Sequence, residues 1–180
     1  MTPVQSIMTA EEMERCISKL AADVLASHSE CDSLALVGIQ RRGVVLAEAL
    51  AAKMTQSLGR PVPTGSLDIT LYRDDWTSKT PKPAIGETRI RFDVAGKNLV
   101  LVDDVLFTGR TIRAALEALA DFGRPSKVEL LVLVDRGHRE LPIHPDYTGV
   151  TIETKRGDRV DVLVQSIDSD QGVRLVPANS

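Results

Sequence analysis

The chain has 180 residues, and its 22 Lys and Arg against 25 Asp and Glu give a formal net charge of -3. This length favours one domain with its own core, so we expect residues 1–180 to form a single domain. The charge argues against a chain devoted to nucleic acid, and no apolar run approaches the ~20 residues of a membrane span. Cys16 and Cys31 form neither a CxxC pair nor a metal-ligand spacing. We therefore expect a cytoplasmic protein without a disulfide framework and without a membrane partner.

The N-terminal third of the chain predicts two helices that flank one buried strand. A capping box of Thr9 and Glu12 opens the first helix, whose apolar positions recur at helical spacing as far as Leu25. The strand is nearly all apolar, as buried parallel strands are, and the second helix ends where glycine and proline follow. The strand, a polar turn and the second helix cover residues 34–39, 40–43 and about 44–58.

The middle of the chain predicts a hairpin with a long excursion. Residues 67–72 alternate polar and apolar side chains, and residues 88–92 do the same, so each segment predicts a strand. The stretch between them, from Arg73 to Gly86, is polar and contains two prolines, which predicts a loop. Loops of this length in a compact domain are usually functional or mobile.

A β-loop-α unit and further strands follow the hairpin. The unit consists of an apolar strand, an acidic loop that contains glycine, and a helix with apolar positions at helical spacing. A second buried strand comes next, and alternating patterns indicate two more strands near the end of the chain. In chain order these six parts cover residues 98–102, 103–109, about 110–122, 128–134, 160–164 and 173–176.

Strands that alternate with helices predict the α/β class, here an open and mostly parallel sheet flanked by helices. Ligands of such sheets bind at the carboxyl ends of the strands. Three polar segments follow predicted strands, at residues 40–43, 103–109 and 135–139. We expect these segments to converge on one ligand site.

The segment from Asp103 to Thr111 carries the clearest chemistry. Two adjacent carboxylates at the end of an apolar strand are costly without partners, so Asp103 and Asp104 predict a ligand with hydroxyl donors or a cation. A ribose diol offers two such donors. At Thr108 and Gly109 the chain enters a helix, whose unpaired N–H groups bind anions such as phosphate. The spacing predicts a sugar-phosphate site, and the absence of GxxxxGKS/T and GxGxxG runs argues against P-loop and Rossmann sites.

Several segments resemble a known family: Val37–Ile39 with Arg42 and Gly43, Asp68–Asp75, Leu99–Thr111 and Val132–Ile143. The run Leu99–Thr111 is similar to the ribosyl-pyrophosphate signature of type I phosphoribosyltransferases. More narrowly, and through the last segment in particular, the chain resembles the bifunctional pyrimidine operon attenuator/uracil phosphoribosyltransferase family.

The resemblance implies the type I phosphoribosyltransferase fold, in which a β-hairpin carries a flexible loop and a small hood is present. It implies transfer of a phosphoribosyl group from 5-phosphoribosyl-1-pyrophosphate to uracil, which gives UMP and pyrophosphate. Mg²⁺ is the implied cofactor, held mainly by the substrate and reached by Asp103 or Asp104 through water. The other implied partners are UMP and UTP, an mRNA leader whose binding these nucleotides control, and further copies of the chain in a dimer or tetramer.

The resemblance and the loop chemistry together predict the residues of the site. Asp103, Asp104 and Arg42 are the predicted catalytic residues, because the carboxylates stabilise a sugar cation and a guanidinium binds the departing diphosphate. Either carboxylate could assist proton removal from uracil, and the sequence does not choose between them. In the family, the loop that starts at Arg73 closes over the substrate. The predicted substrate-binding residues are Arg41, Arg42, Arg73, Asp103, Asp104, Val105, Leu106, Phe107, Thr108, Gly109, Arg110, Thr111 and Arg136, which is expected to lie over the nucleotide.

The sequence departs from the family's pattern where the family binds RNA. His144 stands where arginine is common, Gly149-Val150-Thr151 where Gly-Lys-Asn is common, and Ala22 where histidine is common. Loss of cationic contacts weakens phosphate binding steeply, so we expect weak RNA binding. The cations that could compensate are Lys155, Arg156 and Arg159. Two alternatives to a uracil enzyme stay open: a mainly RNA-binding regulator with a nucleotide pocket, and a phosphoribosyltransferase for another base, such as a purine.

Overall fold

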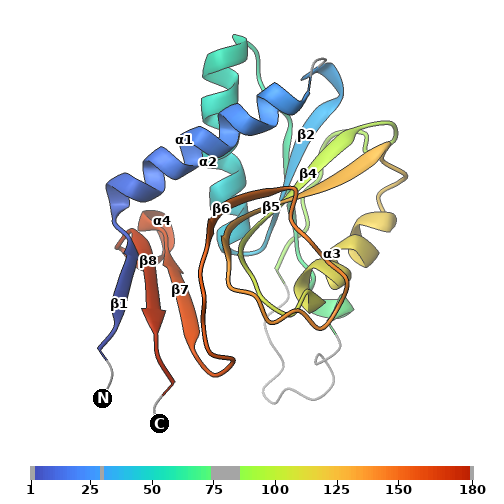
Figure 1. Cartoon of the computed structure of the whole chain (residues 1–180). Helices are drawn as coiled ribbons and strands as arrows, with labels where there is room; N and C mark the ends of the chain where they lie inside the picture. Colours follow the sequence, from blue (N-terminus) through green and yellow to red (C-terminus); the bar gives the residue numbers. More distant parts are fainter. Residues whose placement is uncertain (1–2, 29–30, 74–85, 179–180) are drawn as a thin grey trace.

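The computed structural model of the chain describes residues 3–28, 31–73 and 86–178. One sheet is parallel and consists of β2 (Leu34–Ile39), β3 (Thr64–Leu67), β4 (Asn98–Leu106), β5 (Lys127–Asp135) and β6 (Tyr147–Thr151). The other is antiparallel and consists of β1 (Gln5–Met8), β7 (Arg159–Leu163) and β8 (Gly172–Val176). The helices are α1 (Ala10–Ser27), α2 (Arg42–Leu58), α3 (Arg110–Ala120) and α4 (Gln165–Asp168), and 3-10 turns lie at Cys31–Ser33 and Thr70–Tyr72. The strand orders are β3-β2-β4-β5-β6 and β1-β8-β7, which confirms the predicted open parallel sheet (Figure 1).

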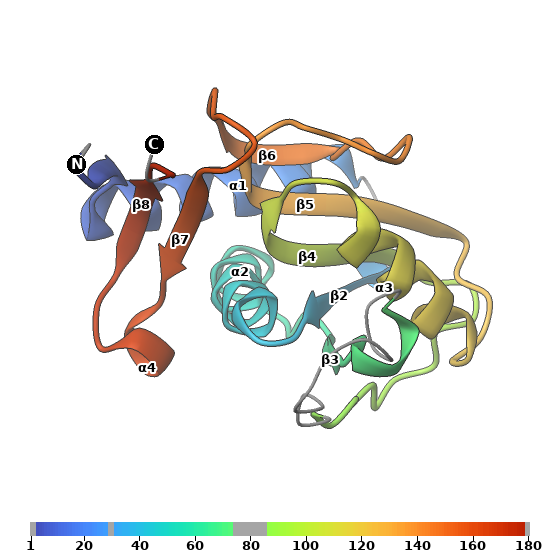
Figure 2. The same ribbon diagram turned by 90° about the horizontal axis from the view of Figure 1, so that it is seen from below.

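Helices cover both faces of the parallel sheet, with α2 and α3 on opposite sides (Figure 2). Successive residues of a strand point to opposite faces. On β2, Leu34 and Leu36 pack with α1 and α2, while Ala35 and Val37 pack with α3. Strands buried on both faces explain the nearly continuous apolar runs of the sequence. In the described part of the chain, no helix is long and apolar enough to cross a membrane.

The helices begin close to where the sequence predicted. The Thr9 N–H donates to Glu12 Oε2 at 2.8 Å and the Glu12 N–H donates to Thr9 Oγ1 at 3.3 Å, so the predicted capping box of α1 is present. α2 starts at Arg42, slightly before the predicted Val44, and ends with Gly59 in the left-handed conformation. α3 starts at Arg110 as predicted. These ends were predictable because each depends on residues next to it in the sequence.

β4 is longer than predicted, which changes where the acidic pair lies. The sequence placed Asp103 and Asp104 on a loop, but β4 continues to Leu106, and Asp103 lies beside Val132 of β5. The loop prediction was wrong because the pattern of apolar residues stops at the first carboxylate, whereas the pairing with β5 does not. The acidic pair is therefore held by the sheet itself.

The predicted strand at 67–72 is wrong. β3 ends at Leu67, and the next residues form a 3-10 turn instead. The Thr70 N–H donates to Asp68 Oδ1 at 2.8 Å, a local bond that bends the backbone away from a strand. The alternating pattern was misleading because Ile69 is buried by the turn, while Leu71 is 55% exposed.

The predicted strand at 88–92 is also wrong as a strand. Only one antiparallel bridge forms there, in which Ser66 and Arg89 exchange backbone hydrogen bonds of 3.0 and 2.8 Å. The described segment therefore follows the edge of β3 without forming the expected hairpin. Residues 74–85, which include most of the predicted loop, lie outside the described residues.

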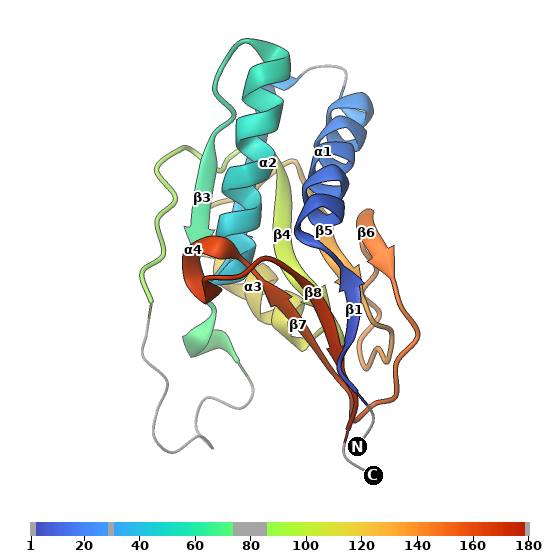
Figure 3. The same cartoon turned by 90° about the vertical axis from the view of Figure 1, so that its left-hand side faces the viewer.

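The antiparallel sheet and α4 form a small hood, as the family resemblance implies (Figure 3). β7 and β8 confirm the two strands predicted near the end of the chain, and β1 pairs with β8. β1 and β6 were not predicted. β6 has Gly149 at its centre, which weakens a strand pattern. A Cβ at that position would lie 2.5 Å from the Leu133 carbonyl oxygen and 2.7 Å from Cys16 Sγ, so the close approach of α1 requires the glycine.

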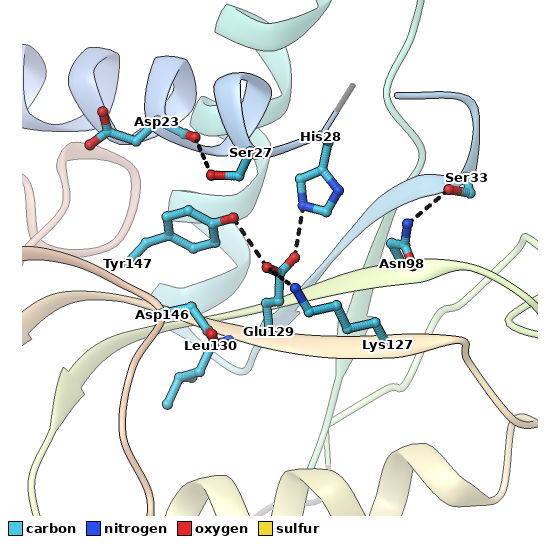
Figure 4. A network of polar contacts seen from close by, with 10 residues as sticks. All are labelled: Asp23, Ser27, His28, Ser33, Asn98, Lys127, Glu129, Leu130, Asp146 and Tyr147. Atoms are coloured by element: carbon cyan, nitrogen blue, oxygen red, sulfur yellow. Dashed lines mark hydrogen bonds and ion pairs between the residues drawn. The ribbon is translucent and has the colours of Figure 1, made fainter. Parts of the chain in front are cut away.

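The amino end of β5 carries a buried polar network (Figure 4). The Glu129 side chain is 5% exposed, and its Oε2 lies 2.7 Å from Nε2 of His28 at the end of α1. Glu129 Oε1 accepts from Lys127 Nζ at 2.7 Å and from the Tyr147 hydroxyl at 3.3 Å. Burial by itself raises the pKa of the Glu129 carboxyl, but the hydrogen bond from Lys127 and the charge of His28 bring it below its usual value. The network ties α1 and β6 to β5.

Candidate functional site

The carboxyl ends of β2, β4 and β5 lie side by side at one edge of the parallel sheet (Figure 1). In the register, Gly38 on β2 lies beside Val102 on β4, and Leu106 on β4 lies beside Asp135 on β5. The chain leaves these ends through the segments 40–43, 107–109 and 136–143. The three polar segments that the sequence singled out therefore meet in space.

The acidic pair lies on the last part of β4. Asp103 is 6% exposed, while Asp104 is half-buried. Their hydrogen bonds are local: the Asp104 N–H donates to Asp103 Oδ1 and the Val105 N–H to Asp104 Oδ1, both at 2.9 Å. Burial and the neighbouring charge of Asp104 raise the pKa of Asp103 well above its usual value, and the charge of Arg73 opposes this. Neither carboxylate forms an ion pair with a cation of the described residues, although the charges of Arg73 and Arg42 act on the pair.

The turn at Phe107–Gly109 leads from β4 into α3 and leaves the start of this helix open. Gly109 precedes the helix with φ +91, and no side chain caps its N–H groups. The contact of the Arg110 N–H with Thr108 Oγ1, at 3.4 Å, is at the limit of a hydrogen bond. α1 starts with a complete capping box, whereas α2 and α3, which both start at this end of the sheet, have no side-chain cap. The N–H groups at a helix start and the positive end of the helix dipole suit a phosphate.

A segment after β5 braces this turn from outside. The N–H groups of Glu140 and Leu141 donate to the Thr108 carbonyl oxygen at 2.9 and 3.2 Å. The Arg139 guanidinium donates to the Phe107 carbonyl oxygen at 3.0 Å and to Asp135 Oδ2 at 2.5 Å. Sequence reasoning missed the bracing by Arg139 and Glu140, because only the folded chain brings them to the turn. The brace fixes the position of the open N–H groups before any ligand binds.

Arg136 lies against Phe107 rather than in solvent. It is 6% exposed, with its guanidinium carbon 4.1 Å from the centre of the Phe107 ring. Its Nη2 donates to the carbonyl oxygens of Lys155 and Arg156 at 3.0 and 3.4 Å, which links β5 to the segment before β7. The structure thus assigns Arg136 a bracing contact, and its predicted contact with the nucleotide stays a prediction.

The turn from β2 into α2 approaches β4 closely. A Cβ on Gly43 would lie 2.4 Å from the Val102 carbonyl oxygen, so only glycine allows this approach. The neighbouring Arg42 donates from Nη2 to Asp168 Oδ1 at 2.7 Å and from Nε to Asp168 Oδ2 at 3.1 Å. These hydrogen bonds raise the pKa of Arg42, and the charge of Asp104 acts in the same direction. Arg42 therefore stands beside the acidic pair and is tied to the hood, a contact that the sequence did not predict.

Arg41 and Arg73 lie at the margins of the site. Arg41 is exposed and lines a cavity of about 580 Å³ together with Ser66, Arg89 and Ile167. The described lining of this cavity does not include the acidic pair, so the cavity lies beside the site rather than over it. Arg73 is exposed at the end of the 3-10 turn, and its charge reaches Asp103. The loop residues Asp74, Asp75 and Trp76 lie outside the described residues.

Comparison with known proteins identifies the class. The sequence pattern of the phosphoribosyl transferase domain matches residues 3–166. The hypoxanthine phosphoribosyltransferase of Trypanosoma cruzi has a TM-score of 0.73 at 15% identity, covering 97% of each chain. That of Staphylococcus aureus has a TM-score of 0.69 at 16% identity, covering 97% of this chain and 92% of its own. At these identities the likeness shows the fold alone, while the domain match makes the chain a phosphoribosyltransferase-domain protein.

Relatives of higher identity narrow the assignment. The bifunctional protein PyrR of Thermus aquaticus is 50% identical over 94% of this chain and 93% of its own length. The proteins of the same name from Deinococcus deserti and Microcystis aeruginosa are 47% and 48% identical, over 96% and 98% of this chain and 94% and 99% of their own lengths. The chain belongs to the bifunctional PyrR family.

Proposed function

We propose that the chain transfers the phosphoribosyl group of 5-phosphoribosyl-1-pyrophosphate to uracil, releasing UMP and pyrophosphate. One observation carries the proposal: an acidic pair, with Asp103 buried and Asp104 half-buried and no ion pair to a described cation, stands a few residues before the start of α3, which has no side-chain cap. The carboxylates suit the ribose diol, and the open N–H groups of α3 suit the 5'-phosphate. Asp104 is the more exposed of the pair, so it is the direct contact to the ribose.

The chemistry of the site is mainly electrostatic. When the bond between the ribose and the diphosphate breaks, positive charge develops on the sugar and negative charge on the leaving group. Fixed carboxylates at Asp103 and Asp104 stabilise the first, and the guanidinium of Arg42 stabilises the second. A carboxyl with a raised pKa, such as Asp103, is also a better proton acceptor near neutral pH than an ordinary aspartate.

Mg²⁺ fits this site as a partner of the substrate. Carboxylate oxygens are ligands that Mg²⁺ prefers, and Asp103 and Asp104 supply them. Among the described residues no group of three or more His, Cys, Asp or Glu side chains could hold a metal alone. Asp103 or Asp104 would therefore hold the ion through water, with substrate oxygens as its main ligands. When bound, the ion neutralises diphosphate charge.

The choice of uracil rests on the segment after β5 rather than on the fold. The structural relatives named above act on hypoxanthine, so the same fold serves a purine. The run Val132–Ile143 resembles that of the uracil enzymes, and it reaches the site through Arg136 and the brace at Arg139. The resemblance of this run, which lies next to the site, supports a pyrimidine as the accepting base.

RNA binding is the second activity that we propose, with low affinity. The family name of the relatives includes the word bifunctional. Two of the cations that could compensate for missing ones are occupied: Arg156 pairs with Glu140, and Arg159 pairs with Asp161 at 2.8 Å. On α1, Lys19 Nζ lies 2.8 Å from Asp23 Oδ2 in another ion pair. Paired cations neutralise fewer phosphates, so a weak interaction is expected.

The test is pyrophosphate release from the ribosyl donor with Mg²⁺ and one nucleobase at a time. We expect release with uracil and none above background with hypoxanthine, guanine or adenine. Faster pyrophosphate release with a purine than with uracil would mean that this purine, and not uracil, is the accepting base. UMP binding without release from any base would instead favour the regulator that keeps a nucleotide pocket.

A further inference from the structure

The hood and the parallel sheet are joined by a two-point ion pair between residues far apart in the sequence. Arg42 opens α2 at the end of β2, and Asp168 ends α4 in the hood. Two of the arginine's nitrogens, Nε and Nη2, bond the two carboxylate oxygens at 3.1 and 2.7 Å. Such bidentate pairs fix the plane of the guanidinium as well as its position.

Both partners of this pair are rigidly held. Asp168 Oδ2 also accepts the Val164 N–H at 2.9 Å, and the Asp168 N–H donates to the Val164 carbonyl oxygen at 2.8 Å. Val164 is buried in the core cluster, and the Asp168 side chain is only 16% exposed. The backbone next to Arg42 is also fixed, because Gly43 packs closely against the Val102 carbonyl of β4. The pair therefore sets the direction of the arginine rather than following it.

The guanidinium retains donors after this pairing. Arginine has five N–H donors, and the contact with Asp168 uses one on Nε and one on Nη2. Three donors remain, and two of them, one on Nη1 and one on Nη2, form an edge that can bind a second bidentate acceptor. The Arg42 side chain is 37% exposed, so that acceptor can come from solvent. One arginine can thus bind the hood carboxylate and a diphosphate together.

We propose that Asp168 is a positioning residue of the hood that orients Arg42 to bind the diphosphate of the ribosyl donor. The inference rests on the proposed function, in which Arg42 meets the departing diphosphate. Asp168 itself touches no substrate. Its effect is confined to the diphosphate, because the 5'-phosphate of UMP binds at the start of α3.

The test compares binding of pyrophosphate with Mg²⁺ and binding of UMP, by calorimetry, in the whole protein and in Asp168→Asn. An amide cannot accept both arginine hydrogen bonds as a charge does, so pyrophosphate affinity should fall about 10- to 100-fold. KM for the ribosyl donor should rise in parallel, while UMP affinity stays unchanged. Asp170→Asn is the control: Asp170 lies on the same hood and pairs with Arg174 at 2.6 Å, away from Arg42. That variant should bind both ligands as the wild type does.

The possible outcomes separate three ideas. If the affinities for UMP and pyrophosphate fall equally in Asp168→Asn, the substitution has a general effect on the fold. If pyrophosphate affinity is unchanged or higher, Asp168 either has no effect on Arg42 or competes with pyrophosphate for it. Each of these results overturns the proposal. If Asp168→Asn does not fold, Asp168→Glu displaces the carboxylate with its charge kept, and the selective loss of pyrophosphate affinity is again expected. In the background of Arg42→Lys, Asp168→Asn should add little further loss. A wild type that binds neither ligand would contradict the proposed function instead.

Discussion

Among the described residues, two carboxylates are buried in the parallel sheet, and they differ in what surrounds them. Glu129, at the amino end of β5, is 5% exposed and has a histidine, a lysine and a tyrosine around its two oxygens (Figure 4). Asp103, near the carboxyl end of β4, is 6% exposed, and its hydrogen bonds are to the adjacent Asp104, with no ion pair to a cation of the described residues. The surroundings bring the pKa of Glu129 below its usual value, whereas burial and Asp104 raise that of Asp103.

The difference teaches how to separate a structural carboxylate from a functional one. Burying a charge is costly unless partners compensate it. The partners of Glu129 come from α1, β5 and β6, so this residue stabilises the fold. Asp103 and Asp104 form no ion pair with a cation of the described residues that would compensate the free-energy cost of burying charge, so we expect a ligand to compensate it. The following predictions test this distinction, starting from the largest effect.

Asp104→Asn should lower turnover about 100- to 1,000-fold, because a fixed charge at the reacting sugar is lost. The fold should persist, since Asp104 is half-buried and its side chain accepts the Val105 N–H, a local bond that an amide oxygen can also accept. Initial rates of pyrophosphate release measure the effect, with Asp93→Asn, a change at an exposed turn, as the control. Normal turnover in Asp104→Asn would remove this residue from the mechanism.

Gly109→Val should abolish binding of both UMP and the ribosyl donor. The residue has φ +91, and its Cβ would lie 3.3 Å from Ile143 Cβ, so a branched side chain shifts the turn that presents the N–H groups. Titration with UMP is the measurement. Gly96→Val is a matched control, because Gly96 also has a positive φ, of +73, but open space around it. Retained UMP affinity in Gly109→Val would place the phosphate elsewhere.

Glu129→Gln should lower the free energy of unfolding by about 1–3 kcal/mol, because buried donors lose a charged acceptor. Turnover should be unchanged at temperatures where the variant is folded. Urea denaturation measures the loss, and Glu117→Gln serves as the control because Glu117 is 56% exposed in a surface pair with Arg113. Reduced turnover in folded Glu129→Gln would break the distinction between the two carboxylates.

Weak RNA binding is the smallest effect that we predict. It applies the same comparison, between charged side chains with and without partners in the protein, to the cations. A pyrimidine-operon leader hairpin and an unrelated hairpin should bind equally weakly, with a shallow salt dependence and no response to UMP. Each phosphate contact contributes about one unit to the salt slope, and pairs such as Arg159–Asp161 reduce the number of contacts. Tight, salt-steep and UMP-dependent preference for the leader would show that other cations bind the RNA.

Elements that depend on neighbouring residues were predictable from the sequence. The capping box of α1 and the strand-turn-helix unit around Gly109 each follow from a short local pattern. The apolar strands were predictable because both their faces are buried.

Features that depend on distant contacts were not predictable. β6 was not predicted, because its glycine is explained only by the contact with α1. The hairpin was predicted wrongly, because the sequence pattern did not show that Asp68 would turn the chain. The acidic pair was predicted to lie on a loop, because the local sequence pattern does not show the pairing of these residues with β5. The contact of Arg42 with Asp168 spans 126 residues and has no local signal at all.

Asp103→Asn provides the most direct test, because one substitution should move stability and turnover in opposite directions. The pKa of Asp103 is raised in the folded protein, so its ionised form destabilises the fold. This cost is absent below the unfolded pKa of about 3.9 and grows as the pH rises from that value towards the folded pKa. At pH 7 the variant should therefore melt at a higher temperature than the wild type, with the difference vanishing in acid, while pyrophosphate release falls by orders of magnitude. Unchanged turnover, or a lower melting temperature at pH 7, would contradict the account.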